Sequence, residues 1–217
     1  MALNNKFELK TEKMTATQAH QAGIDVGLRA YMLRVYNYMT LGLGLTGAVA
    51  FAASTNLDLM QIIHGTGLRW LVMLAPLGFV IFLSARINAM RPATAQTVFW
   101  LYAALMGLSL SYIFLAFTGA SITRVFFITA GTFAAMSLYG YTTKRDLSKF
   151  GSFLFMGLIG IILASIVNIF LASSALHFVI SIIGVLVFVG LTAYDTQAIK
   201  SMYNVSDSGV IQEKKAI

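Results

Sequence analysis

One carboxylate in this sequence directly follows a long apolar run. It is Asp195, in the segment FVGLTAYDTQAIK at residues 188–200. A helix from residue 175 to residue 195 rises about 30 Å at 1.5 Å per residue, which matches the hydrocarbon thickness of a bilayer. Asp195 is therefore predicted at one edge of a membrane. An acid there is solvated by water, paired locally with Lys200, or functional.

Two hydrolytic chemistries can be tested against the residue types present. Intramembrane aspartyl proteases need a second aspartate that shares a proton with the first, and no other apolar segment of the sequence carries one. A rhomboid-type serine protease needs Gly-x-Ser-x-Gly, whereas GLSLS at residues 107–111 lacks the last glycine. The sequence also has no phosphate loop, dinucleotide fingerprint or metal-ligand cluster. We therefore expect neither an enzyme nor a bound cofactor.

The elements that must position Asp195 are membrane spans. Of the 217 residues, 58% are hydrophobic and 11% are charged, whereas soluble domains have about 45–50% and about 25%. Six apolar segments have roughly the length that crosses a bilayer: 36–53, 70–84, 96–117, 122–141, 150–171 and 175–194. The sequence therefore predicts an all-α, multi-pass transmembrane bundle with six spans.

Positive charge is distributed unevenly between the two sides of this bundle. All but two of the 15 lysines and arginines fall before span one, between spans two and three, between spans four and five, or after span six. Because cytoplasmic loops accumulate these residues, both termini and Asp195 are predicted on the cytoplasmic side. The net charge of +7 then indicates contact with anionic lipid, with no need for nucleic acid. The predicted parts are a tail (1–34), a membrane domain (35–200) and a C-terminal segment (201–217).

Two segments carry a resemblance to a known family. SLYGYTTKRDLSKFGSFLFMGLIGIILASIVNIFL (137–171) and GVLVFVGLTAYDTQAIK (184–200) closely resemble the Bax inhibitor-1 family, and within it the bacterial YccA-like branch. The resemblance covers about residues 29–200. It implies a seven-helix protein of the bacterial inner membrane, with one central helix. Members are linked to pH-sensitive calcium leak, to suppression of cell death in eukaryotes, and to modulation of a membrane-bound protease in bacteria.

The resemblance also implies a latch made of two aspartates, on helices six and seven, near the cytoplasmic mouth of a pore. Asp195 matches the first aspartate by its Tyr-Asp context, and Arg86 matches an arginine that pairs with the two acids. Two close carboxylates cannot both ionise cheaply, so such a pair titrates and can open the latch. Ionised oxygens attract Ca²⁺, a hard cation; for Asp195 we expect weak contact during transit.

The sequence departs from the family pattern at its end. The seventh helix and its aspartate would follow the segment SMYNVSDSGVIQEKKAI, and the sequence ends there, at Ile217. Asp207 lies in this polar segment and does not match the second aspartate. We therefore expect an exposed groove between helices where the seventh helix would pack, and a chain that is less stable or non-conducting alone.

Three functions remain open. The first is a pH-sensitive calcium or cation leak channel, or a regulator of one, in which Asp195 is the latch and Ca²⁺ and protons are the partners. The second is a membrane adaptor that modulates a membrane-bound protease without transport. The third is a small-molecule transporter, for which Asn168 is the best polar candidate. Asn168 lies near the outer end of span five, however, and we expect it to bond between helices.

Overall fold

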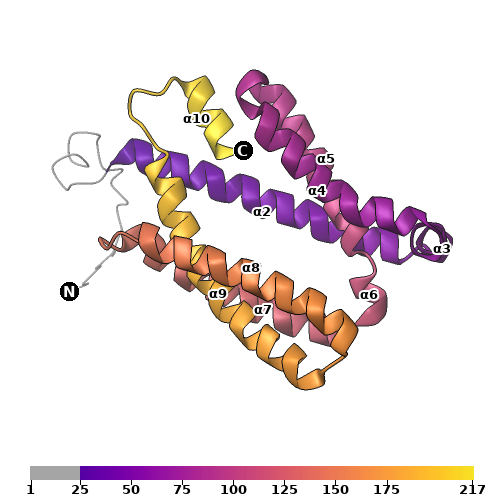
Figure 1. Cartoon of the computed structure of the whole chain (residues 1–217). Coiled ribbons are helices and arrows are strands. Elements are labelled where there is room, and N and C mark those ends of the chain that lie inside the picture. The colour runs from indigo at the N-terminus through magenta and orange to yellow at the C-terminus, as the bar shows by residue number, and fades with distance from the viewer. Residues whose placement is uncertain (1–24) are drawn as a thin grey trace, which may run out of the picture.

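The computed structural model describes residues 25–217, in which the ordered elements are helices connected by short loops (Figure 1). Residues 1–24, most of the predicted tail, lie outside the described residues. The helices, in chain order, are α2 (Val26–Ser54), α3 (Leu57–Gly65), α4 (Leu68–Arg86), the 3₁₀ turn η1 (Ile87–Ala89), α5 (Pro92–Leu110), α6 (Ile113–Ala116), α7 (Gly119–Thr142), α8 (Ser148–Leu171), α9 (Ser174–Ser201) and α10 (Gly209–Ala216).

Most of these helices are long and apolar enough to cross a membrane. Five qualify by length and hydropathy: α4, α5 together with α6, α7, α8 and α9. Helices α2 and α3 qualify only as a pair, bent by 100° at the break between them, and count as a sixth candidate span. The predicted all-α, multi-pass bundle is therefore confirmed, with the first predicted span in α2 and the other five in the helices named above.

Local side-chain chemistry explains where several helices begin. The Asn56 carboxamide oxygen accepts the N–H of Leu59 at 3.0 Å in the first turn of α3. The hydroxyls of Thr118 and Ser173 accept N–H groups in the first turns of α7 and α9 in the same way. Pro92 opens α5, where its missing N–H costs nothing. These contacts satisfy donors that the start of any helix leaves without an intrahelical partner.

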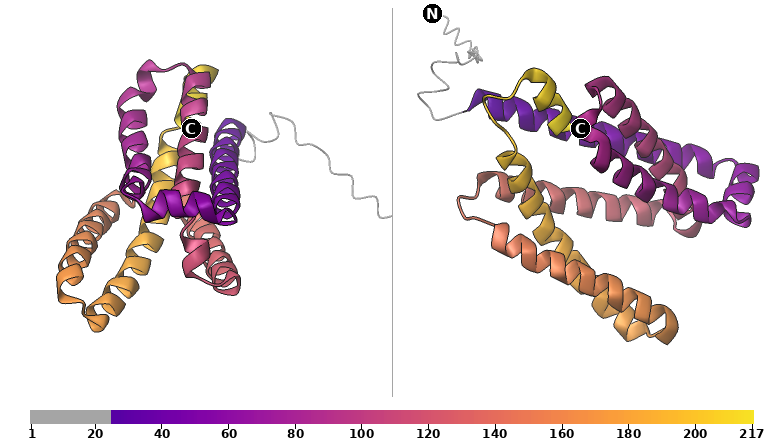
Figure 2. Two further views of the ribbon diagram at one scale, coloured as in Figure 1. Left: turned by 90° about the vertical axis from the view of Figure 1, so that its right-hand side faces the viewer. Right: turned by 45° about the horizontal axis from the view of Figure 1, so that its top comes forward.

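The helices form two groups, which Figures 1 and 2 show from three directions. Helix α5 packs between α2 and α4 in the first group, and α9 packs between α7 and α8 in the second. Small residues permit the close approaches. At Gly107 in α5, for example, an added Cβ would lie 2.6 Å from the Thr46 carbonyl oxygen of α2.

The surface of both groups is strongly apolar. Large side chains of the long helices point away from the bundle, and Ile169 and Phe170 of α8 are 76% and 85% exposed. Contiguous exposed apolar surface on this scale indicates a membrane or a partner. The outward faces of the long helices are therefore the lipid-contacting surface.

Four features differ from the sequence expectations. Helix α2 begins at Val26, so its first turns lie within the segment 1–34 that we assigned to the tail. The third predicted span is broken near Ser111 into α5 and α6. The segment 201–217, expected to be a linker, contains α10, and α3 had not been expected.

Candidate functional site

The helix ends around α10 form the candidate site, and we call this region the terminal end of the bundle. Helix α2 begins there and α9 ends there. Ile199 of α9 packs against a cluster that contains Tyr31 and Met32 of α2. Tyr203, just after α9, lies directly against Gly27 of α2. The terminal end thus joins the two helix groups, which are otherwise in limited contact.

Gln197 fixes the loop between α7 and α8 at this end. Its side-chain oxygen accepts the Leu147 N–H at 2.8 Å, and its Nε2 donates to the Arg145 carbonyl oxygen at 2.8 Å. One side chain therefore satisfies two main-chain groups of the loop. The two motifs that carried the family resemblance, Tyr-Asp-Thr-Gln and Lys-Arg-Asp-Leu, are physically bonded to each other through this amide.

Close packing holds the same turns of α9 against both neighbours. The Ala193 carbonyl oxygen lies directly over Gly140 of α7, leaving no space for a Cβ there. On the α8 side, the Tyr194 ring lies over Gly151, where an added Cβ would come within 2.5 Å of ring carbons. Helix α9 is therefore tightly held on the two faces that contact α7 and α8.

Asp195 lies on a different face of α9. Its side chain is exposed, and no hydrogen bond or ion pair engages it within residues 25–217. Ile199, one turn further on and on the same face, packs toward the start of α2. Leu191, one turn earlier, packs against Leu154 of α8. Asp195 thus lies between a turn of α9 that contacts α8 and a turn that contacts the first helix group.

Neither basic partner considered for Asp195 contacts it in this structure. The Lys200 ammonium donates to the Tyr141 carbonyl oxygen at 2.8 Å and lies 5.1 Å from the centre of that ring. Arg86 is exposed at the last residue of α4, and among the described residues it forms no ion pair. The structure therefore does not bring Arg86 and Asp195 together, and the role of Arg86 as a counter-ion stays a prediction.

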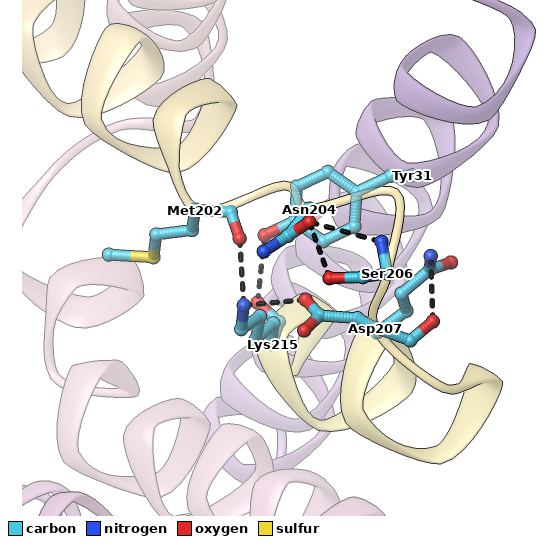
Figure 3. A network of polar contacts seen from close by, with 7 residues as sticks. Tyr31, Met202, Asn204, Ser206, Asp207 and Lys215 are labelled. Atoms are coloured by element: carbon cyan, nitrogen blue, oxygen red, sulfur yellow. Dashed lines mark hydrogen bonds and ion pairs between the residues drawn. The ribbon is translucent and has the colours of Figure 1, made fainter.

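Helix α10 is docked at the terminal end by a polar network (Figure 3). The Lys215 ammonium forms an ion pair with Asp207 at 2.6 Å and donates to the Met202 carbonyl oxygen at 2.9 Å. The Tyr31 hydroxyl donates to the Lys215 carbonyl oxygen at 3.2 Å. Asp207 did not match the second latch aspartate in the sequence. In the structure it is paired with a lysine within the segment after α9.

A second polar contact ties α10 to the first helix group. The Gln96 Nε2 donates to the Glu213 carboxylate of α10 at 2.6 Å and to the Tyr38 hydroxyl of α2 at 2.6 Å. Gln96 therefore links α5, α2 and α10 at one point. Sequence reasoning did not find this contact, because its three members are separated by 58 and 117 positions along the chain.

One loop carboxylate at this end has a shifted pKa. The side chain of Ser148 and its backbone N–H hydrogen-bond to Asp146, and they hold the pKa of that carboxyl below its ordinary value. Lys149 adds a smaller attraction in the same direction. The donated bonds stabilise the charged form, and the bond from the Ser148 N–H, at 2.9 Å, satisfies a donor at the start of α8.

At the opposite end of the bundle, a histidine and a serine that are 47 residues apart in the sequence lie side by side. The His64 Nε2 of α3 lies 3.2 Å from the Ser111 hydroxyl at the break between α5 and α6. A serine beside a histidine can act as a nucleophile. Here, however, Ser111 is fully buried and its hydroxyl donates to the Leu108 carbonyl oxygen at 2.6 Å. The contact therefore connects α3 to the helix break and presents no accessible nucleophile.

Asn168, the polar candidate for a transporter site, has a local partner. Its side-chain oxygen accepts the Ser173 N–H at 3.1 Å across the turn between α8 and α9. The turn requires Ala172 to adopt a left-handed backbone with φ 47°, which is unusual for a residue with a Cβ. Asn168 thus stabilises a turn, and our expectation that it bonds between helices was wrong.

No group of three or more His, Asp or Glu side chains in residues 25–217 is arranged to hold a metal ion. At the terminal end, Asp195 therefore offers a cation one carboxylate, whereas calcium sites use six to eight oxygens. Such a group suits transient contact with a passing cation better than storage of one.

The comparisons with known proteins agree with these motifs. The family model described as "Inhibitor of apoptosis-promoting Bax1" matches residues 28–215, which include α2, the loop bonded to Gln197, and α9. The chain belongs to the Bax inhibitor-1 family. The match extends into α10 at the terminal end, so each helix that builds the candidate site lies almost entirely within the family region.

Relatives in this family are similar over most of their length. Protein RP147 of Rickettsia prowazekii is 48% identical over 207 residues, covering 95% of this chain and 87% of the relative. Inner membrane protein YbhL of Escherichia coli K12 is 53% identical over 178 residues, covering 81% and 76%. Membrane protein SpyM3_0260 of Streptococcus pyogenes is 35% identical over 195 residues, covering 86% and 82%. No solved structure matches the chain.

Proposed function

We propose that this membrane protein is a pH-sensitive calcium or cation leak channel, or a regulator of one, and that Asp195 is its titratable group. One observation carries this proposal. Asp195 is the only acid within α2, α4, α5, α7, α8 and α9, and among the described residues nothing neutralises it. An unpaired acid at the edge of an apolar span is costly and is commonly functional.

The surroundings of Asp195 support a gating role. Its neighbours on α9 are fixed by Gln197 and by the contacts at Gly140 and Gly151. Asp195 itself lies one turn from Ile199, which packs at the junction between the two helix groups. The contacts with α7 and α8 prevent α9 from moving relative to those two helices. A change of charge on Asp195 therefore acts on the junction with the first helix group. Titration of one carboxyl would then bias how the groups sit together.

We further propose that the terminal end faces the cytoplasm of a bacterial cell. Lysines and arginines favour the cytoplasmic side of a membrane. Lys144 and Arg145 lie in the loop at this end, and Lys149 lies in the first turn of α8. The similarity to an inner membrane protein of Escherichia coli supports the same membrane. In this orientation Asp195 responds to the pH of the cytoplasm.

Flux through liposomes tests the proposal. The purified chain is reconstituted with a calcium indicator inside, and Ca²⁺ entry is measured between pH 6 and pH 8. The sequence led us to expect a chain that does not conduct alone, whereas Asp195, unpaired among the described residues and beside the junction, leads to a different forecast. We expect the wild-type flux to change severalfold over this range, and the Asp195→Asn flux to be independent of pH. Asp146→Asn is the matched control, since it removes a loop carboxylate at the same end of the bundle and should keep the pH dependence.

The alternative is an adaptor that modulates a membrane-bound protease without transport. It predicts that the chain carries no Ca²⁺. Liposomes would show no flux above the lipid background at any pH, with either variant. Protease activity in cells would instead depend on the chain while being indifferent to Asp195→Asn. That pair of results would replace the channel proposal.

A further inference from the structure

An apolar groove lies between α2 and α7 beside the terminal end. Its volume is about 600 Å³, and it is lined by Arg29, Met32, Leu33, Tyr36, Phe133, Ala134, Ser137, Leu138 and Tyr141. Leu33 and Leu138 on its rim are 53% and 63% exposed. The rim therefore belongs to the outward apolar surface, and the groove opens toward lipid.

The groove has a polar end and an apolar end. The Tyr36 and Phe133 rings contact each other edge to face, with their centres 6.5 Å apart, which fixes the apolar end. The two helices run in opposite directions from there, so Arg29 on α2 and Tyr141 on α7 lie at the other end, about 10–12 Å away at 1.5 Å per residue. Arg29 forms no ion pair within residues 25–217.

Ser137 lies midway along the groove and has an unmet hydrogen bond. It is 5% exposed, and its hydroxyl is the one buried side-chain polar atom of the described residues without a partner. Other serines in these long helices, such as Ser165 and Ser181, donate to the carbonyl four residues earlier. A buried hydroxyl left unbonded is costly. The Ser137 oxygen is covered in this structure, so a ligand in the groove reaches it only when the Ser137 side chain turns toward the groove.

We propose that this groove binds an anionic phospholipid, with its phosphate on Arg29, an ester carbonyl accepting the Ser137 hydroxyl, and an acyl chain running toward Tyr36 and Phe133. The order of these groups along the groove is the order along the lipid: charge, then ester, then hydrocarbon. Arginine is a strong phosphate partner, and anionic lipids are available at a membrane surface. The bound lipid would bridge α2 and α7, and hence the two helix groups.

Photo-crosslinking in lipid nanodiscs tests the proposal with the full 217-residue chain. The probe is phosphatidylglycerol with a photoreactive diazirine in its acyl chain, at a few per cent in phosphatidylcholine. We expect peptides containing residues 29–36 and 133–141 to be labelled at least threefold more than residues 166–170 of α8. That reference segment is largely apolar and exposed but does not line this groove. Unlabelled phosphatidylglycerol should compete, whereas phosphatidylcholine and glycerol phosphate should not.

Four variants make the test specific. Arg29→Gln should lower groove labelling severalfold, and Ser137→Ala should lower it less. Lys149→Gln, which removes a cation in the first turn of α8, should leave groove labelling unchanged. Ala134→Leu fills the groove and should abolish labelling while circular dichroism shows unchanged helix content, which keeps the test valid if Arg29→Gln fails to fold.

Four outcomes would overturn the proposal. Equal labelling of the groove and of residues 166–170 would mean that lipid contacts the groove no more than any apolar face. Equal labelling by a choline lipid, or competition by glycerol phosphate, would remove the requirement for an anionic lipid. Crosslinks from a cysteine placed at Leu138 to a second copy of the chain would assign the groove to a protein helix. The chain contains no cysteine, so that single thiol reports without a background.

Discussion

Gln197 and Leu147 are 50 residues apart in the sequence and 2.8 Å apart in the structure, where the Gln197 side-chain oxygen accepts the Leu147 N–H. The same amide donates to the Arg145 carbonyl oxygen. This relationship makes the loop between α7 and α8 part of the α9 structure. Any movement of the end of α9 therefore moves the loop as well, and with it the start of α8.

Replacing Gln197 should loosen this loop. Gln197→Ala removes two hydrogen bonds, each worth about 0.5–1.5 kcal/mol net, so we expect the free energy of unfolding to fall by about 1–3 kcal/mol. Thermal unfolding in detergent measures the change. Ser201→Ala serves as the control, because its hydroxyl bonds only within its own helix, to Ala198. Equal melting temperatures for the two variants would show that the clamp does not stabilise the fold.

A methyl group at Gly140 should separate α7 from α9. The Ala193 carbonyl oxygen occupies the space that the new Cβ needs, and forced packing of this kind costs about 1–3 kcal/mol. Gly131→Ala is the matched control in the same helix, since nothing lies within 4 Å of its added Cβ. It should gain about 0.5–1 kcal/mol from helix propensity. Melting temperatures that rise for both variants would contradict the packing at Gly140.

The Asp146 carboxyl should titrate below an ordinary aspartate. Its folded pKa is lowered by the bonds from Ser148, so its contribution to stability is present above the unfolded pKa. That contribution is lost as the pH falls through the folded value. NMR of the labelled carboxyl measures the midpoint, and Ser148→Ala should raise it part of the way toward normal, since the backbone bond remains. A midpoint unmoved by Ser148→Ala would assign the shift to another cause.

Helix α10 should detach when its contact with α5 is removed. Glu213→Ala deletes the carboxylate that accepts the Gln96 amide at 2.6 Å, leaving that donor to Tyr38 alone. We expect amide hydrogen exchange of residues 209–216 to quicken severalfold, with α7, α8 and α9 unchanged. Val210→Ala is the control, because Val210 is 55% exposed and the change removes no polar contact. Unchanged exchange would show that the Glu213 contact does not hold α10.

The spans could be predicted because their signal is local. A long apolar run specifies a membrane helix wherever it packs, and the predicted segments 122–141 and 150–171 lie within α7 and α8 as observed. Helix α3 was not predicted, because its nine residues are too few for a membrane span. The break between α5 and α6 at Ser111 was not predicted, because neither a proline nor a glycine lies at that position.

The site was harder to predict, because it depends on contacts between distant segments. The sequence pointed to Asp195 through its position after an apolar run, and the structure places it at the end of the bundle that joins the two helix groups. The pairing with Lys200 could not be judged from spacing, since the Tyr141 carbonyl that takes the lysine lies 59 residues away. Gln197 was quoted within the motif, yet its function became visible only when α9 and the loop were seen together.

Helix α2 has a length that no membrane requires. Its 29 residues reach about 43 Å at 1.5 Å per residue, whereas the hydrocarbon layer is about 30 Å thick. With little tilt, roughly two turns of α2 extend into the aqueous layer. These turns contain Tyr31, whose hydroxyl bonds to α10. One part of the molecule is thus solvated by water and the other by lipid. The start of α2 and α10, in water, can unfold or tighten while the helices in lipid stay folded.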